Sequence, residues 1–237
     1  MATNIVGMGV DDTNNLVFVW FDDGTVSAGS SKNLSAKRQL EPYKLPGGKS
    51  PKDIVEMAID GTNNFVFAWY RDGTVSAGSS RDLGAKRPPQ PYKLPDNKKP
   101  GDIVGMGIDG VNNLVFAWYA DGTVSAGSSR DLGAKRKPQA YQLPAGKTPA
   151  DIVGMDIDGL VFDKPAERLF TLVGETFKLV TGDDQNAPTT AESGVNIGKA
   201  LSGVITELVF AWYRDGTVSA GSSRELAKLR QPYSYVR

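Results

Sequence analysis

Hydrophobic and polar positions follow the same short order four times along the chain. An alternating stretch such as Ile103–Asp109 (IVGMGID) precedes a polar turn cluster and then a run that is apolar on both faces, such as Leu114–Tyr119 (LVFAWY). The alternation predicts a half-buried strand, and the continuous run predicts a strand packed between two layers. The tripeptide RDG or ADG that follows predicts a hairpin turn whose Gly takes a positive φ.

The rest of each repeat predicts two further segments. Residues 123–129 (TVSAGSS) are small or β-branched and predict the returning strand of the hairpin, and residues 130–136 (RDLGAKR) predict a polar connector. PYKLP, at residues 91–95, predicts a brief edge strand, because proline is tolerated at a sheet edge. Four short antiparallel strands in a tandem repeat are typical of a propeller blade. We therefore expect an all-β propeller.

The spacing of the tryptophans gives the period of the repeat. Trp20, Trp69 and Trp118 are 49 residues apart, and Trp212 follows after 94. Residues 66–87 and 115–136 differ at one position only, which indicates recent duplication or deliberate construction. The sequence predicts a single propeller domain over 1–237, with repeats at 5–53, 54–102, 103–151 and 152–237 and a divergent insert at 160–207.

The insert leaves the number of blades open. It is nearly as long as one repeat, and residues 169–182 (LFTLVGETFKLVTG) predict a strand, a Gly-Glu turn and a second strand. Residues 195–207 are compatible with either an inner strand or a short amphipathic helix. We expect five blades, four clear and one degenerate. The alternatives are four blades plus an inserted element, or an artificial junction.

Composition excludes several classes of function. Lys and Arg together number 27, as do Asp and Glu, so no net charge favours nucleic acid or anionic membranes. The chain has neither Cys nor His, which argues against zinc, copper and thiolate chemistry, and no cofactor is expected. The sequence shows neither a secretory signal nor a long apolar run, so we expect synthesis in the cytosol without membrane insertion. Later release to act outside the cell is an open alternative.

The repeat resembles a known family. The pattern DIVGMGIDG…NNLVFAWYADGTVSAGSSRDL…PYKLP is similar to that of bacterial β-propeller lectins of the Photorhabdus fucose-binding type, over residues 4–159 and 208–237. That family closes with seven blades, and this chain has fewer. The resemblance implies binding of glycans or glycoconjugates, with fucose-like or related sugars as ligands, at sites between neighbouring blades. A chain with so few repeats could also complete a ring as a homo-oligomer.

A sugar site needs an aromatic platform and fixed polar groups. Trp and Tyr are neighbours on one strand and point to opposite faces, so one of each pair is expected to touch ligand. The alternatives are that the aromatics only fill the space between blades, that the serines stand at strand ends, and that the arginines are plain surface. The candidate sugar-binding residues are Trp20, Trp69, Trp118, Trp212, Tyr70, Tyr119, Tyr213, Ser76, Ser79, Ser125, Ser128, Arg71 and Arg214.

The sequence favours a multivalent lectin without catalysis. The acids that recur in each repeat, such as Asp60, Asp72 and Asp102, fall mostly at turns, and the unrepeated acids of the insert specify no reaction. The Asp- and Asn-rich turns have neither the spacing nor the closing Glu of a calcium loop, and Asx turns explain them. The alternatives are a protein-interaction scaffold, or a synthetic or recombined repeat propeller with no ligand.

Overall fold

The computed structural model describes residues 4–11, 13–110, 112–158 and 208–236, together with the backbone of residues 169–173 and 176–180. The chain divides into two compact units, residues 1–159 with 207–237, and residues 160–206. The first unit holds four sheets, each of four antiparallel strands. The second holds one hairpin, β14 (Leu169–Val173) and β15 (Thr176–Val180), paired from Leu169↔Val180 to Val173↔Thr176.

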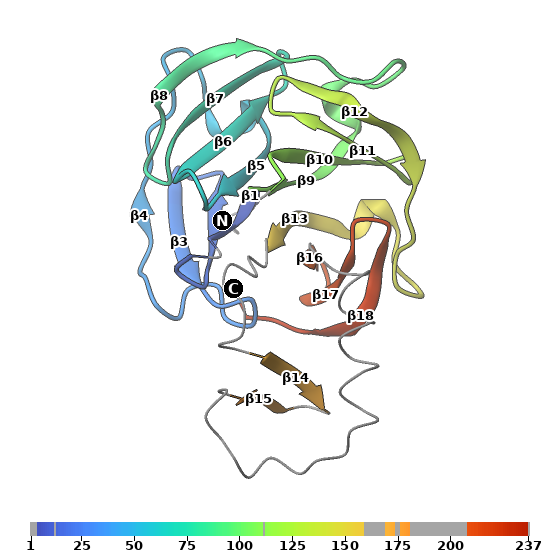
Figure 1. Ribbon diagram of the computed structural model, residues 1–237. Helices are drawn as coiled ribbons and strands as arrows, with labels where there is room; N and C mark the ends of the chain where they lie inside the picture. The colour runs from blue at the N-terminus through green and yellow to red at the C-terminus, as the bar shows by residue number, and fades with distance from the viewer. Residues whose placement is uncertain are drawn as a thin grey trace. The chain divides into compact units, whose positions relative to one another are not determined.

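The four sheets of the first unit are the blades of a propeller (Figure 1). Blade 1 consists of β1 (Ile5–Asp11), β2 (Leu16–Phe21), β3 (Thr25–Gly29) and β4 (Glu41–Pro42). Blade 2 consists of β5 (Ile54–Asp60), β6 (Phe65–Tyr70), β7 (Thr74–Ser79) and β8 (Asp82–Pro91). Blade 3 consists of β9 (Ile103–Asp109), β10 (Leu114–Tyr119), β11 (Thr123–Ser128) and β12 (Asp131–Ala140). Blade 4 consists of β13 (Ile152–Asp158), β16 (Leu208–Tyr213), β17 (Thr217–Ser222) and β18 (Glu225–Ser234). Single 3₁₀ turns precede β5, β9 and β13, at η1 (Pro51–Asp53), η2 (Pro100–Asp102) and η3 (Pro149–Asp151).

The blades close into a ring of four. The innermost strands contact one another in sequence, β1 with β5, β5 with β9 and β9 with β13, and β13 contacts β1 again. The chain end completes the last boundary, because the Val236 amide donates to the Lys32 carbonyl at 2.8 Å and the Leu34 amide donates to the Val236 carbonyl at 2.9 Å. Below, the seams are numbered by blade: seam 1 joins blades 1 and 2, seam 2 blades 2 and 3, seam 3 blades 3 and 4, and seam 4 blades 4 and 1.

The all-β propeller of four-stranded antiparallel blades is confirmed, and the preferred count of five blades is corrected to four. Strand β13 pairs with β16 across the insert, with Gly154 opposite Trp212, just as β9 pairs with β10 with Gly105 opposite Trp118. The insert therefore interrupts the β13–β16 turn of a complete blade, which is the alternative of four blades plus an inserted element. The hairpin expected within residues 169–182 forms, whereas residues 195–207 lie outside the described residues.

The outer strand differs from the sequence prediction. Residues of the expected polar connector lie within β8 and β12, which run on through prolines to the edge of their sheets. Pro88, Pro89 and Pro91 are tolerated there because an edge strand needs no donors on its free side. PYKLP instead crosses to the next blade, where the Lys93 amide donates to the Arg130 carbonyl at 2.8 Å.

The core lies at the seams between blades. The hydrophobic cluster at seam 2, for example, joins Trp69 and Phe67 of blade 2 to Met106 and Tyr119 of blade 3. The inner glycines admit this close packing, since a Cβ on Gly105 would lie 2.5 Å from the Cγ of Met155. A methionine side chain of the next inner strand thus occupies the space that a side chain at this glycine would need. The Gly of each DG turn has the expected positive φ, 80° at Gly73.

Four acids are buried on the inner strands, Glu56, Asp60, Asp109 and Asp156, and two of them, Asp156 and Glu56, lie away from the strand ends. The Asp156 carboxylate accepts backbone N–H groups from the inner strands of the other three blades, from Val10 at 2.6 Å, Ile108 at 3.2 Å and Ile59 at 3.4 Å. Glu56 is also buried and accepts from the Met57 amide at 3.1 Å. Burial raises the pKa of both carboxyls well above the ordinary range, while the backbone donors oppose that rise. These contacts place Asp156 among all four inner strands.

Candidate functional site

The four predicted tryptophan platforms are core residues. Trp20, Trp69, Trp118 and Trp212 each have an exposed fraction of 0%. Each indole stacks on the Phe two residues earlier, as in the Phe67–Trp69 pair, with ring centroids 5.8 Å apart. A sugar needs an exposed ring face for stacking, and these rings offer none. Their burial fits the alternative stated from the sequence, in which the tryptophans fill the space between blades.

The indole N–H groups join neighbouring blades. Trp20 donates to the carbonyl of Ser80 at 2.9 Å, Trp69 to that of Ser129 at 3.0 Å and Trp118 to that of Ser223 at 2.8 Å. Each acceptor lies in the turn between the third and fourth strands of the next blade. At seam 4 the pattern breaks, because the buried indole N–H of Trp212 has no partner among the described residues.

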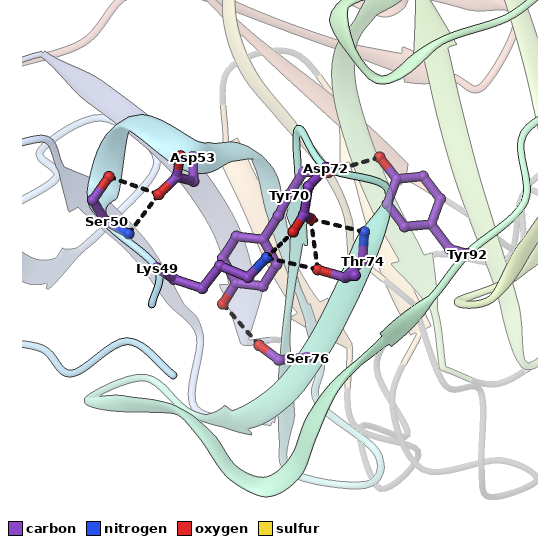
Figure 2. Close-up of polar contacts among 8 residues, drawn as sticks. All are labelled: Lys49, Ser50, Asp53, Tyr70, Asp72, Thr74, Ser76 and Tyr92. Atoms are coloured by element: carbon purple, nitrogen blue, oxygen red, sulfur yellow. Dashed lines mark hydrogen bonds and ion pairs between the residues drawn. The ribbon is translucent and has the colours of Figure 1, made fainter. Parts of the chain in front are cut away.

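The predicted tyrosines and two of the predicted serines belong to buried hydrogen-bond networks inside blades 2, 3 and 4. The Tyr70 hydroxyl lies 2.8 Å from the Ser76 hydroxyl, which donates to the Leu83 carbonyl at 2.6 Å (Figure 2). Tyr119 and Ser125 repeat this contact at 2.8 Å, and Tyr213 repeats it with Ser219. Burial raises the pKa of Tyr70, Tyr119 and Tyr213 to about 12, so these phenols stay protonated at neutral pH.

A lysine from each connection between two blades lies over the tyrosine of the following blade. The Lys49 ammonium lies 4.6 Å from the centroid of the Tyr70 ring, ion-pairs with Asp72 and donates to the Thr74 hydroxyl at 2.9 Å (Figure 2). The hydrogen bond from Lys49 lowers the pKa of the Asp72 carboxyl. Lys98 and Lys147 repeat the arrangement in blades 3 and 4. These contacts hold each connection against its blade, and the lysine covers one face of the tyrosine ring.

The remaining candidates are exposed but lie apart from one another. The hydroxyls of Ser79 and Ser128 each accept an amide N–H at 3.1 Å, from Asp82 and Asp131 respectively, and so shape the turn before the outer strand. Arg71 donates through Nε to the Lys52 carbonyl at 3.0 Å, and Arg214 donates likewise to the Ala150 carbonyl. The structure therefore does not bring the predicted aromatic, serine and arginine residues together into one open site.

The described residues instead form a groove at seam 2. Its volume is about 420 Å³, and it lies between the outer part of blade 2 and the Ser129–Arg130 turn of blade 3. The apolar part of its lining consists of Phe67, Val75, Ala77 and Pro88, of which Pro88 is the exposed one. The polar part of the lining is Ser76, Lys86, Arg87, Gln90, Ser129 and Arg130.

A second cavity, of about 400 Å³, lies at seam 3. Its lining combines Ala140 and Gln142, from the end of blade 3 and its connection, with Ser222, Arg224 and Glu225 of blade 4. Arg224 has the same place in blade 4 as Arg130 has in blade 3, since both follow a Trp-bonded Ser in the turn before the outer strand. Two successive seams thus present an open polar depression with an arginine from the following blade.

Sequence reasoning missed the basic residues of these depressions. Lys86, Arg87 and Arg130 fell in a segment interpreted as a polar connector, whereas the structure places the first two on an outer strand facing a seam. Variation between repeats is a signal that could have found the groove. The residue two positions before the Tyr of PYKLP is Glu41, Gln90, Gln139 and Tyr233 in the four blades, although the TVSAG strand is identical in all four.

The described residues provide no metal centre and no membrane span. No group of three or more acidic side chains gathers where it could hold a metal ion in the described part of the chain. Within the same part, no helix is long and apolar enough to cross a bilayer.

Comparison with known proteins gives similarity in architecture only. No protein-family profile matches the chain, and no curated protein is similar to it. Among solved structures, the chain is similar to the crystal structure of the computationally designed Ika4 protein, at 15% identity over 93% of this chain and 92% of that one, with a TM-score of 0.34. It is also similar to U3-55K, at 12% identity over 95% of this chain and 63% of that one, with a TM-score of 0.38. The chain thus spans less than two thirds of U3-55K, and both likenesses are too distant to carry an argument about function.

Proposed function

We propose that this protein is a multivalent carbohydrate-binding protein without catalytic activity, and that it holds its ligands in the depressions at the blade seams. A propeller fits a binding scaffold, and the seam 2 groove is the observation that carries the finer proposal. It combines a small apolar surface from Pro88 and the edge of Phe67 with hydroxyl, amide and guanidinium groups. Saccharides present the matching chemistry, a weakly apolar ring face surrounded by hydroxyls.

Repetition supports binding through several weak sites. A shallow polar groove gives modest affinity on its own, but copies held on one rigid ring raise the effective concentration for a clustered glycan. The resemblance of the repeat to fucose-binding propeller lectins supports the same ligand class, with hexoses as the first ligands to test. We assign no reaction, because the acids that recur in each repeat lie at turns, where several of them form ion pairs with lysine side chains.

A glycan array screened with labelled protein tests the proposal. Wild-type protein should bind a set of glycans that the double variant Arg130→Ala/Arg224→Ala loses, because both arginines line seam depressions. The matched control is Arg71→Ala/Arg214→Ala, which removes two exposed arginines outside the depressions and should leave binding unchanged.

A blank array from folded protein would contradict the proposal and favour the alternative of a protein-interaction scaffold. Loss of binding in the Arg71→Ala/Arg214→Ala control, with the seam variant unaffected, would place the glycan site at the β6–β7 and β16–β17 turns instead.

A further inference from the structure

The seams of the ring differ in one charge. At seam 1, Glu41 of blade 1 ion-pairs with Arg81 in the turn of blade 2. In the repeat of blade 2, Gln90 replaces Glu41, and Arg130 of blade 3 replaces Arg81. Equivalent positions at seams 1 and 2 therefore differ. At seam 1 the arginine is paired with a carboxylate, and at seam 2 a glutamine stands where that carboxylate would be.

The groove at seam 2 is consequently basic. Gln90 and Arg130 both line it, together with Lys86 and Arg87, and its lining includes no carboxylate. None of these three cations forms an ion pair with another described residue. Lys86 and Arg87 lie over the Phe65 ring at 4.5 and 5.1 Å from its centroid, a contact that leaves them without a counter-charge.

Seam 3 has the same replacement as seam 2. Gln139 has the place of Gln90, Arg224 has the place of Arg130, and Lys135 and Arg136 correspond to Lys86 and Arg87. Arg224 lines the depression at this seam together with Gln142 and Glu225, and the Glu225 carboxylate ion-pairs with Lys228 at 2.7 Å. At seam 4 the same position is Tyr233, whose ring lies 5.5 Å from the Lys32 ammonium. Seams 2 and 3 thus each have an arginine in an open depression, and neither arginine forms an ion pair with another described residue.

We propose that seams 2 and 3 select anionic saccharides, those that carry a uronate carboxylate or a sulfate ester, whereas seam 1 does not. This inference rests on the proposed carbohydrate-binding function and names its ligand class. A guanidinium can hold a carboxylate or sulfate through two parallel N–H···O bonds, and the neighbouring Lys86 and Arg87 add charge. The Gln90 amide supplies donor and acceptor groups for hydroxyls without neutralising Arg130.

The local nature of this charge favours a saccharide over a nucleic acid. Binding to a phosphate backbone uses a continuous basic surface, and this chain has equal numbers of acidic and basic residues. The exposed Pro88 and the 8% of Phe67 that is exposed give a sugar ring a small apolar surface that an isolated anion would not use. The groove therefore fits a ring that carries one negative group.

Trigalacturonate and its fully methyl-esterified form provide matched probes, because they share one sugar chain and differ only in whether each carboxyl is a free carboxylate or a neutral methyl ester. Titration calorimetry of the full chain with each probe at about 0.05 M salt should show about fivefold tighter binding of the free acid, a preference that declines at about 0.5 M salt through screening. Inorganic tripolyphosphate serves as the anion without a sugar.

Two substitutions use the chain as its own control. Gln90→Glu/Gln139→Glu gives seams 2 and 3 the pairing found at seam 1, so the preference for the free acid should disappear while binding of the methyl ester remains. Glu41→Gln gives seam 1 the glutamine of seam 2 and should raise the number of sites that bind the free acid. Circular dichroism of each variant checks that the fold is kept.

The outcomes separate this inference from the proposed function. Equal binding of acid and ester by the wild type, or a preference that survives Gln90→Glu/Gln139→Glu, would overturn the anionic selection and leave carbohydrate binding intact. Binding of tripolyphosphate as tight as that of trigalacturonate would overturn the assignment to saccharides. Failure of both saccharides to bind, together with a blank glycan array, would overturn the proposed function itself.

Discussion

At the scale of single residues, Trp118 and Trp212 provide an internal comparison. Both are fully buried at equivalent places in their blades, but only the indole N–H of Trp118 has an acceptor, the Ser223 carbonyl at 2.8 Å. A buried donor without a partner destabilises the fold, whereas a satisfied one contributes a net stabilisation.

Replacement by phenylalanine should therefore cost more at Trp118 than at Trp212. Both variants lose the same packed volume, but only Trp118→Phe breaks a hydrogen bond and leaves a carbonyl unpaired, so the difference should be about 1 kcal/mol. Urea denaturation followed by circular dichroism measures the two free energies of unfolding. Equal costs would mean that the indole hydrogen bonds at the seams contribute nothing to stability.

Glu56 gives a prediction about pH. Its carboxyl is buried on an inner strand where the equivalent residues are Gly7, Gly105 and Gly154, and burial raises its pKa well above 4.5. A carboxyl whose pKa is higher in the folded state binds protons more tightly there, so its contribution to stability is complete below about pH 4.5 and falls as the pH rises.

The variant Glu56→Gln should remove this decline. We expect it to be more stable than the wild type at pH 8 and to differ little at pH 4.5, as measured by urea denaturation across that range. Asp156, the other buried acid near it, should keep a residual slope of the same sign. Asp53, whose pKa is lowered by hydrogen bonds from Ser50, is the control: its carboxylate stabilises the fold above about pH 3.8, so Asp53→Asn should lower stability equally at pH 4.5 and pH 8 and leave the slope between them unchanged. A steeper decline in Glu56→Gln would contradict the account.

At the scale of elements, the insert is separable from blade 4. The pairing of β13 with β16 continues to Asp158↔Leu208 on either side of it, as β5 pairs with β6 to Asp60↔Phe65 around a short turn. Replacing residues 160–207 by Thr-Asn-Asn, the turn that blade 2 uses after Gly61, should therefore leave a folded four-bladed ring.

Circular dichroism and a single cooperative urea transition would test the shortened chain. Retention of the β-sheet signal with one transition is the expected result. Loss of cooperativity would show that the insert is needed to complete the ring, as a fifth blade would be.

The strands show which parts of a fold a repeat can predict. Period-2 alternation and the DG turns identified the inner strands and the central hairpins, because these features are local. The outer strand was wrongly placed at PYKLP, since the segment RDLGAKR was interpreted as a connector. The pairing of this segment with β7 depends on how the chain passes to the next blade. The number of blades likewise depends on the contact of β1 with β13, which no local pattern contains.

At the scale of the whole molecule, the residues that line the seam depressions could not be predicted from the sequence. Conspicuous aromatics such as Trp69 and Tyr70 indicated stacking, but a strand that is apolar on both faces buries them between blades. The residues that line the seam 2 groove, among them Gln90 and Arg130, come from two different repeats. Their proximity follows from the closure of the ring, which places the outer strand of one blade beside the turn of the next.

Nuclear magnetic resonance of ¹⁵N-arginine-labelled protein is the most direct test of a ligand site at the seams. Titration with trigalacturonate should shift the side-chain signals of Arg130 and Arg224, which line the seam depressions, and leave those of Arg71 and Arg214 in place. Shifts confined to Arg71 and Arg214 would contradict the seam account, and so would a titration that moves none of these four signals.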